Sequence, residues 1–337
     1  MTKSNRKTLK SVDELVDGWT SASGSNQHLS VIRDLVRFLS LELYGQYEPF
    51  AAMAPPFWER LAGWLQNVGS TKDRQCLLEF VPWLLFIGQE EMKTMYQAAF
   101  AGPIRRWIIN EAQLDITATD LSEQLAVEVR QTFFGSIAGM QIDSFARING
   151  LGGQSLRPNF RDLSRAGDFD RFKHDEIQGL GYQRIVAVED MVGTGTQMME
   201  AAPILAHMTP LKVLLCPIVV APAGVDRWLD ELKPFPEYAH FSFEPLFVIP
   251  ANATLPMKRG RQPEPVEVRE FRALLKQTWP QVQGTHPSSQ LYSEFGFGNF
   301  GSLVLSYLNC PDNVPPLVHY EGDQWQPLFP RVPREGG

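Results

Sequence analysis

The chain has 337 residues, of which 44% are hydrophobic and 20% are charged, and its formal net charge is -7. These values are typical of globular proteins and exclude disordered and fibrous chains, and the acidic total disfavours direct DNA binding. The three cysteines, Cys76, Cys216 and Cys310, include no CxxC pair, so neither a disulfide framework nor a zinc site is indicated, and a cytoplasmic location is expected.

The N-terminal third of the chain predicts a tail followed by helices. Residues 1–27 are polar and predict a flexible tail, and no apolar segment follows their basic residues, which argues against a secretory signal. Residues 28–112 carry apolar side chains at helical spacing and predict a helical region. Helices are expected at VIRDLVRFLSLELY, FWERLAGWLQNV, KDRQCLLEFVPWLLFIG and EEMKTMYQAAFAGPIRRWIINE. The most apolar window, 77–88, is too short to cross a bilayer, so a soluble protein with no membrane partner is expected.

Residues 113–337 predict an α/β core that ends in a strand-and-turn element. Strands are expected at TFFGSIAG, IDSFARI, QRIVAVE, KVLLCPIVVA, FSFEPLFVIP and SLVLSYLN. Two of these runs, RIVAVE and KVLLCPIVVA, are continuously apolar and are joined by the helix-compatible segment QMMEAAPILAHM, which is typical of a βαβ unit. The prolines at 250–287 predict a long, partly irregular excursion. The predicted fold class is therefore α/β, with a doubly wound, mostly parallel sheet and a helical N-terminal region.

One segment, 185–197, combines groups that suit a ribose phosphate. It runs from a buried strand through an acidic pair and two apolar residues into Gly193-Thr194-Gly195-Thr196, and a helix follows. Glycines allow a tight turn that presents backbone N–H groups, and a helix N-terminus favours an anion, so the turn suits a phosphate. Carboxylates at a strand end can accept hydrogen bonds from ribose hydroxyls. A ribose 5-phosphate needs both kinds of group.

This order of residues resembles the phosphoribosyl-pyrophosphate-binding motif of type I phosphoribosyltransferases. The motif consists of four apolar residues, two acidic residues, two apolar residues and a phosphate loop, and Ile185–Val188 fill its first part. Two positions depart from it: Gly193 stands where Ser, Thr, Ala or Val is usual, and Gln197 stands where a second hydroxyl-bearing or small residue usually closes the loop. The resemblance implies catalytic roles for Glu189 and Asp190, and Mg²⁺ bound through the substrate phosphates. It implies ribose and phosphate contacts from Glu189, Asp190, Met191, Val192, Gly193, Thr194, Gly195, Thr196 and Gln197.

The C-terminal stretch narrows the resemblance. It is similar to the end of a divergent group of phosphoribosyltransferase-like proteins associated with bacterial conflict and antiphage (retron-type) effector systems. The shared features are a turn with Asn309, Pro311 and Asn313 and the ending WQPLFPR at 325–331, and the likeness covers 57–331. It implies a toxin-like effector that breaks or exchanges the bond at ribose C1 and is restrained by partner proteins or a nucleoprotein.

Several alternatives stay open. The loop could be an ordinary connection between a strand and a helix. The whole chain could also be a catalytically inactive nucleotide sensor or assembly subunit, and the departures at Gly193 and Gln197 favour this second interpretation. Whether the protein is an enzyme is therefore undecided. A dinucleotide site is disfavoured because GxGxxG is absent. The six histidines are scattered and predict no protein-built metal site. A second group of candidates could bind a phosphate or a base, or could simply belong to solvated turns and faces. These residues are Asp143, Ser144, Arg147, Arg157, Arg161, Asn309 and Asn313, and they are called the second-tier residues below.

Overall fold

The computed structural model describes residues 10–22, 27–49, 55–163, 169–250, 253–255, 264–284, 292–322 and 324–332. The chain divides into two compact units. A helical unit comprises Met1–Gln89 and Asn252–Gly337, and a sheet unit comprises Glu90–Ala251. The sequence had predicted a different division, with 113–337 as one core. In the structure the last part of the chain joins the N-terminal helices because their apolar side chains form one buried cluster.

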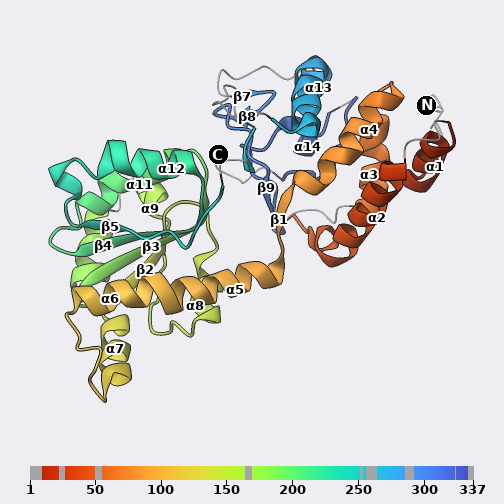
Figure 1. Ribbon diagram of the computed structural model, residues 1–337. Helices are drawn as coiled ribbons and strands as arrows, with labels where there is room; N and C mark the ends of the chain where they lie inside the picture. Colours follow the sequence, from red (N-terminus) through yellow and green to blue (C-terminus); the bar gives the residue numbers. More distant parts are fainter. Residues whose placement is uncertain are drawn as a thin grey trace, which may run out of the picture. The chain divides into compact units, whose positions relative to one another are not determined.

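The helical unit consists mainly of helices, with short strand pairs between them (Figure 1). Strands β1 and β9 pair in parallel, and β7 and β8 form an antiparallel hairpin. Its helices are α1 (Val12–Ala22), α2 (Gln27–Glu42), η1 (Tyr44–Gln46), α3 (Phe57–Gln66), α4 (Thr71–Phe80), η2 (Val81–Trp83), α13 (Val266–Gln283) and α14 (Pro316–His319). Its strands are β1 (Leu85–Ile87), β7 (Tyr292–Ser293), β8 (Gly296–Phe297) and β9 (Val304–Ser306). Helix α13 lies within the stretch for which an irregular excursion was predicted.

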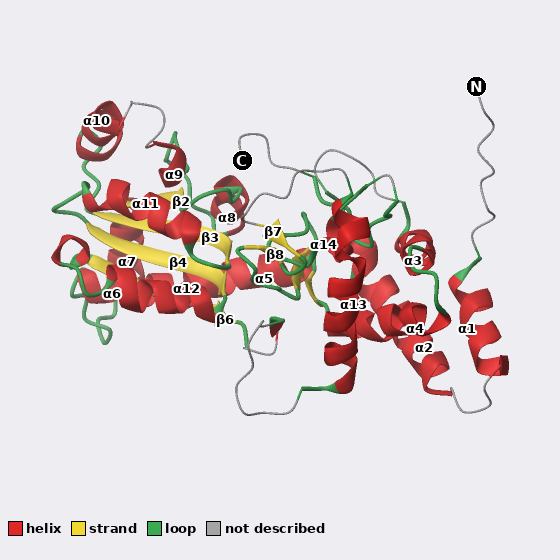
Figure 2. Cartoon of the chain, turned by 90° about the horizontal axis from the view of Figure 1, so that it is seen from above, coloured by secondary structure: helices red, strands yellow, loops and turns green. Residues whose placement is uncertain are grey.

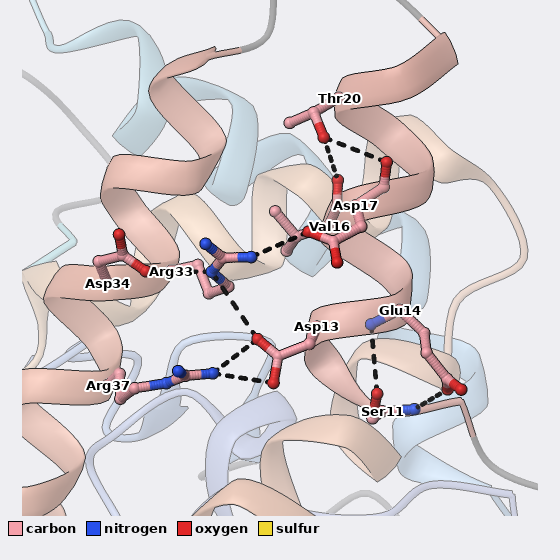
Figure 3. Close-up of polar contacts among 9 residues, drawn as sticks. All are labelled: Ser11, Asp13, Glu14, Val16, Asp17, Thr20, Arg33, Asp34 and Arg37. Carbon is pink, nitrogen blue, oxygen red and sulfur yellow. Dashed lines mark hydrogen bonds and ion pairs between the residues drawn. The ribbon is translucent and has the colours of Figure 1, made fainter.

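Residues 1–27 were predicted to be a flexible tail, and this prediction is wrong for Val12–Ala22, which form helix α1. Its start has a reciprocal cap, in which Ser11 Oγ accepts the N–H of Glu14 and Glu14 Oε2 accepts the N–H of Ser11, at 3.2 and 2.7 Å. On its outer side, Arg37 Nη2 lies 2.6 Å from Asp13 Oδ1, and Arg33 of α2 also reaches α1 (Figure 3). A buried stripe with helical spacing, hidden in the polar composition, faces the core: Val12, Leu15, Val16 and Trp19.

The C-terminal ending of the chain is part of the core of the helical unit. Trp325, Leu328 and Phe329 are at most 1% exposed. The indole N–H groups of Trp64 in α3 and Trp325 both donate to the backbone oxygen of Leu317, at 2.8 and 2.9 Å. These contacts explain why the C-terminal segment belongs with the helices and not with the parallel sheet.

We expect the stability of the protein to fall in acid because of His319. Burial, followed by the charge of Arg331, lowers the pKa of His319 to about 3 from 6.5. Since the unfolded chain binds the proton more tightly, stability is complete above pH 6.5 and is lost as the pH falls from 6.5 towards 3, by about 2 kcal/mol at pH 5. Urea unfolding at pH 8 and pH 5 should show this loss, and His319→Gln should flatten it. Equal losses in both proteins would contradict the assignment.

The sheet unit is built around parallel strands. Its strands are β2 (Thr132–Ser136), β3 (Arg184–Val192), β4 (Lys212–Val220), β5 (Phe241–Phe243) and β6 (Phe247–Val248). Its helices are α5 (Gln89–Ala99), η3 (Phe100–Ile104), α6 (Arg105–Glu111), α7 (Leu121–Arg130), α8 (Ile142–Ile148), α9 (Phe160–Leu163), α10 (Phe169–Arg171), η4 (Phe172–Gln178), α11 (Thr196–Ala206), α12 (Pro222–Arg227), η5 (Trp228–Leu232) and η6 (Pro236–Tyr238). Figure 2 shows β2, β3 and β4 side by side.

The order of the strands explains how the sheet is covered. The order β2-β3-β4-β5 follows the chain, and every pairing in it is parallel. Right-handed crossovers between strands in chain order place the connecting helices α9, α11 and α12 on one face, as Figure 1 shows. Helices α5, α6 and α7, which precede β2, lie on the other face, and so does α8, which follows β2 and packs on α5. The predicted α/β fold with a doubly covered, parallel sheet and N-terminal helices is confirmed.

Three details of the predicted elements differ. The run KDRQCLLEFVPWLLFIG was predicted as one helix, but α4 ends at Phe80 and Leu85–Ile87 form strand β1. The run IDSFARI, predicted as a strand, is helix α8. The buried residues Ile142, Phe145 and Ala146 follow helical spacing, which a short apolar run does not distinguish from a strand. Helices α5 and α6, assigned by sequence to the helical region, belong to the sheet unit apart from the first residue of α5. Among the described residues, no helix combines the length and apolar character needed to cross a membrane.

Candidate functional site

The carboxyl ends of β2, β3 and β4 lie at one edge of the sheet. Ser136, the last residue of β2, pairs with Val188 of β3, and the N–H of Ile137 donates to the oxygen of Val188 at 2.9 Å. At the next junction the N–H of Ala221 donates to the oxygen of Val192, also at 2.9 Å. The three loops that leave these strands are therefore neighbours, and this edge is where open α/β sheets bind ligands.

The acidic pair lies inside strand β3 and not after it. The strand continues to Val192, and Glu189 pairs with Pro217 of β4. Successive side chains of a strand point to opposite faces. Since Ala187 belongs to the apolar cluster on the α11 face, Glu189 points to that face and Asp190 to the α5 face. The two carboxylates therefore have separate surroundings.

Glu189 connects strand β3 to the loop after β2. It is 3% exposed, and its Oε2 accepts the N–H of Ala138 in that loop at 2.6 Å. A carboxylate that is buried in this way needs hydrogen-bond donors, which the backbone supplies. Glu189 thereby holds the loop after β2 against the end of β3.

Asp190 is the more accessible carboxylate. It is partly exposed, and its Oδ1 accepts a hydrogen bond from the hydroxyl of Tyr96 in α5. Met191, the next residue, is also partly exposed, whereas Val192 is buried. Among these four residues of β3, Asp190 is thus the charged group within reach of a ligand.

The loop after β3 has the geometry of an anion-binding turn. Gly195 precedes helix α11 with φ +78°, a left-handed conformation that favours glycine. Its oxygen accepts the N–H of Met199 at 3.0 Å, and the hydroxyls of Thr194 and Thr196 lie 3.0 Å apart. Gly193, Thr194 and Thr196 are partly exposed, and Gln197 is exposed. Backbone N–H groups and the positive end of the α11 dipole thus meet two hydroxyl groups at one turn.

The loop is packed against α12, which the sequence analysis did not single out. A Cβ at Gly195 would lie 3.2 Å from Cδ and 3.3 Å from Cβ of Arg227. A Cβ at Gly224 would lie 2.9 Å from a methyl group of Val192 and 3.2 Å from the oxygen of Gly193. The guanidinium of Arg227 pairs with Glu231, with Nε 3.3 Å from Oε1. Gly224 could have been found by sequence, because it stands at the start of the helix after β4.

Of the second-tier residues after β2, Arg161 lies on α9, with its Nε 3.9 Å from Oε2 of Glu200 in α11, and the others lie on helix α8 or contact it. Asp143 and Arg147 are exposed on α8, and Ser144 is partly exposed. Arg157 Nη1 lies 3.3 Å from Asp143 Oδ1, and its Nη2 donates to the oxygen of Leu151 at 2.7 Å. Arg157 therefore braces the loop that follows α8.

Asn309 and Asn313 belong to the helical unit, so the structure does not group them with the loop after β3. The side chain of Asn309 holds the end of the chain: its Nδ2 donates to the oxygen of Val332 at 2.7 Å, and its Oδ1 accepts the N–H of Val332 at 3.2 Å. The backbone oxygen of Asn313 accepts the N–H of Ser302 at 2.9 Å. These contacts join segments that are apart in the sequence, so they are structural contacts of the helical unit and not the local bonding of an Asn side chain to its own turn.

The described part of the chain contains no group of three or more His, Cys, Asp and Glu side chains that could hold a metal ion. Mg²⁺ is commonly bound by one or two carboxylates together with water and substrate phosphates.

A family model matches the chain over residues 61–331, and its description is PRTase-CE. The chain belongs to the PRTase-CE family. The match includes the parallel sheet, the loop after β3 and the C-terminal ending. Membership supports a phosphoribosyltransferase-like function with the transferase and nucleotide-binding character of that class. Comparisons with curated proteins and with solved structures gave no match.

Proposed function

We propose that this PRTase-CE protein binds the ribose 5-phosphate part of phosphoribosyl pyrophosphate or of a related nucleotide. The observation that carries the proposal is that the partly exposed Asp190 lies near the end of β3 and that the turn around Gly195 follows it directly. The turn offers backbone N–H groups, two hydroxyls and a helix N-terminus to the 5-phosphate. Asp190 accepts hydrogen bonds from the ribose hydroxyls.

The proposal changes the role that the sequence suggested for Glu189. Both carboxylates were candidates for the ribose hydroxyls, but Glu189 is 3% exposed and already accepts the N–H of Ala138. We assign Glu189 to holding the neighbouring loop and Asp190 to contacting the ligand. Mg²⁺ would arrive on the phosphates of the ligand, and the partly exposed oxygens of Asp190 suit such a cation.

The reaction we propose is cleavage or exchange of the bond at ribose C1. Departure of the leaving group gives an oxocarbenium-like ribose, which is stabilised by positioning and by nearby negative charge. Asp190 supplies that charge at the end of β3, and the turn around Gly195 fixes the phosphate. By its likeness to conflict and antiphage proteins, we place this reaction in a toxin-like effector restrained by partner proteins or a nucleoprotein.

Binding by calorimetry tests the site. We expect Asp190→Ala to weaken ribose 5-phosphate binding roughly tenfold or more, since hydrogen bonds to a charged group are lost. Thr194→Arg should abolish binding because its side chain would fill the turn. Asp175→Ala is the matched control, since it removes a carboxylate paired with Arg171 elsewhere in the sheet unit. Full binding by Asp190→Ala would rule the assignment out. Growth arrest on expression, abolished by Asp190→Ala, is expected of a toxin-like effector.

A non-enzymatic nucleotide sensor or assembly subunit is the second candidate. Gly193 and Gln197 favour it, because Gly193 lacks the side chain usual at its position and Gln197 stands where a hydroxyl-bearing or small residue usually closes the phosphate loop. Incubation with phosphoribosyl pyrophosphate, nucleotides and a panel of bases distinguishes the two. Turnover selects the enzyme, and saturable binding without turnover selects the sensor.

A further inference from the structure

Tyr96 of helix α5 connects that helix to the end of strand β3. Its hydroxyl donates to Oδ1 of Asp190, although 94 positions separate the two residues in the sequence. Tyr96 is 3% exposed, so its hydroxyl is directed by the surrounding structure and not by solvent. The contact lies within the sheet unit.

The position of Tyr96 is fixed from two directions. Its ring lies edge-on to Phe145 of α8, with centroids 5.6 Å apart and an angle of 71° between the ring planes. Asn149 Nδ2 donates to the backbone oxygens of Tyr96 and Phe145, at 3.3 and 3.0 Å. Helices α5 and α8 therefore hold the tyrosine as a rigid donor.

A rigid donor limits how a carboxylate can turn. A hydrogen bond from a hydroxyl to an ionised carboxylate is short and stronger than a neutral one. A carboxylate offers about four acceptor positions on its two oxygens, so a donor on Oδ1 orients the carboxylate and leaves acceptor capacity for a ligand. Without such a donor, the Asp190 side chain would rotate freely and would lose that freedom when the ligand binds. This entropic cost would weaken the affinity for the ligand.

We propose that Tyr96 is a positioning residue for the ribose site and that it acts through Asp190. It orients the carboxylate so that the acceptor positions not used by the tyrosine meet the 2- and 3-hydroxyls of the ribose. This inference rests on the proposed function of the site, and it makes helix α5 part of that site. Nothing in the motif around Asp190 indicates such a partner.

Tyr96→Phe tests the inference, because it removes the hydroxyl and keeps the ring against Phe145. The probes are ribose 5-phosphate and 2-deoxyribose 5-phosphate, measured by calorimetry on the full chain. We expect wild-type protein to prefer the ribose form, and Tyr96→Phe to bind that form on the order of tenfold more weakly. Binding of the deoxy form should change much less, so the preference is reduced. Tyr238→Phe, the same change elsewhere in the sheet unit, should leave both affinities unchanged.

A double-mutant cycle separates positioning from packing. If Tyr96 acts through Asp190, Tyr96→Phe should have little further effect in an Asp190→Ala background, where the acceptor of its hydrogen bond is gone. Equal weakening of both ligands by Tyr96→Phe, or independent effects in the cycle, would overturn the inference while leaving the site in place. Wild-type protein that binds neither sugar phosphate would overturn the proposed function together with it. Melting temperatures of all variants show whether a loss of binding reflects unfolding.

Discussion

Replacement of Gly195 by alanine should weaken ribose 5-phosphate binding roughly tenfold to a hundredfold, because a small displacement of a positioning loop is costly. The backbone φ of +78° would cost a residue with a Cβ about 1–2 kcal/mol. The added Cβ would also lie 3.2 Å from Cδ of Arg227, so α12 or the turn has to move. Calorimetry measures the affinity, and urea unfolding measures the stability.

Gly181→Ala is the matched control for Gly195→Ala. Gly181 also has a left-handed φ, of +72°, but a Cβ there would have no atom within 4 Å. It should therefore share the cost in stability, about 1–2 kcal/mol, without the crowding. Its ligand affinity should equal that of wild type. Equal affinities of the two variants would show that the turn around Gly195 does not hold the phosphate.

Replacement of Trp325 by alanine should produce the largest loss of stability, about 3–5 kcal/mol. The side chain is 1% exposed, and its indole N–H donates to Leu317 at 2.9 Å, so the variant leaves a cavity and removes a buried hydrogen bond. Urea unfolding followed by circular dichroism gives the free energy. Trp83→Ala is the control, since Trp83 is only partly buried and should lose less. Similar losses in both variants would mean that the C-terminal ending is not an integral part of the core.

The predictions for Gly195 and Trp325 concern two different parts of the region that the family model matches. The match extends to residue 331, but the ending from Trp325 onward is buried core of the helical unit. The turn around Gly195 is instead partly exposed at a sheet edge. We therefore expect the ending to be required for folding and the turn to be required for the ligand.

Local patterns predicted the elements around the candidate site well. The runs Ile185–Val188 and Val213–Val220 are buried, parallel and joined by helix α11, as their continuous apolar character indicated. Patterns shorter than a few turns were less informative. The segment at α8 was predicted as a strand because a few apolar residues fit either period. The apolar stripe of α1 was missed because it lies within a polar stretch.

The sequence by itself determined that an apolar run, an acidic pair and a glycine-rich turn follow one another, because all three are encoded within 185–197. It also determined the α/β class, since buried parallel strands need continuous apolar runs. Only the tertiary structure decided that Glu189 and Asp190 face opposite sides of the sheet and that Tyr96 contacts Asp190. It also decided that the C-terminal ending completes the N-terminal helices. Such contacts join distant parts of the chain, and they depend on packing that no local period encodes.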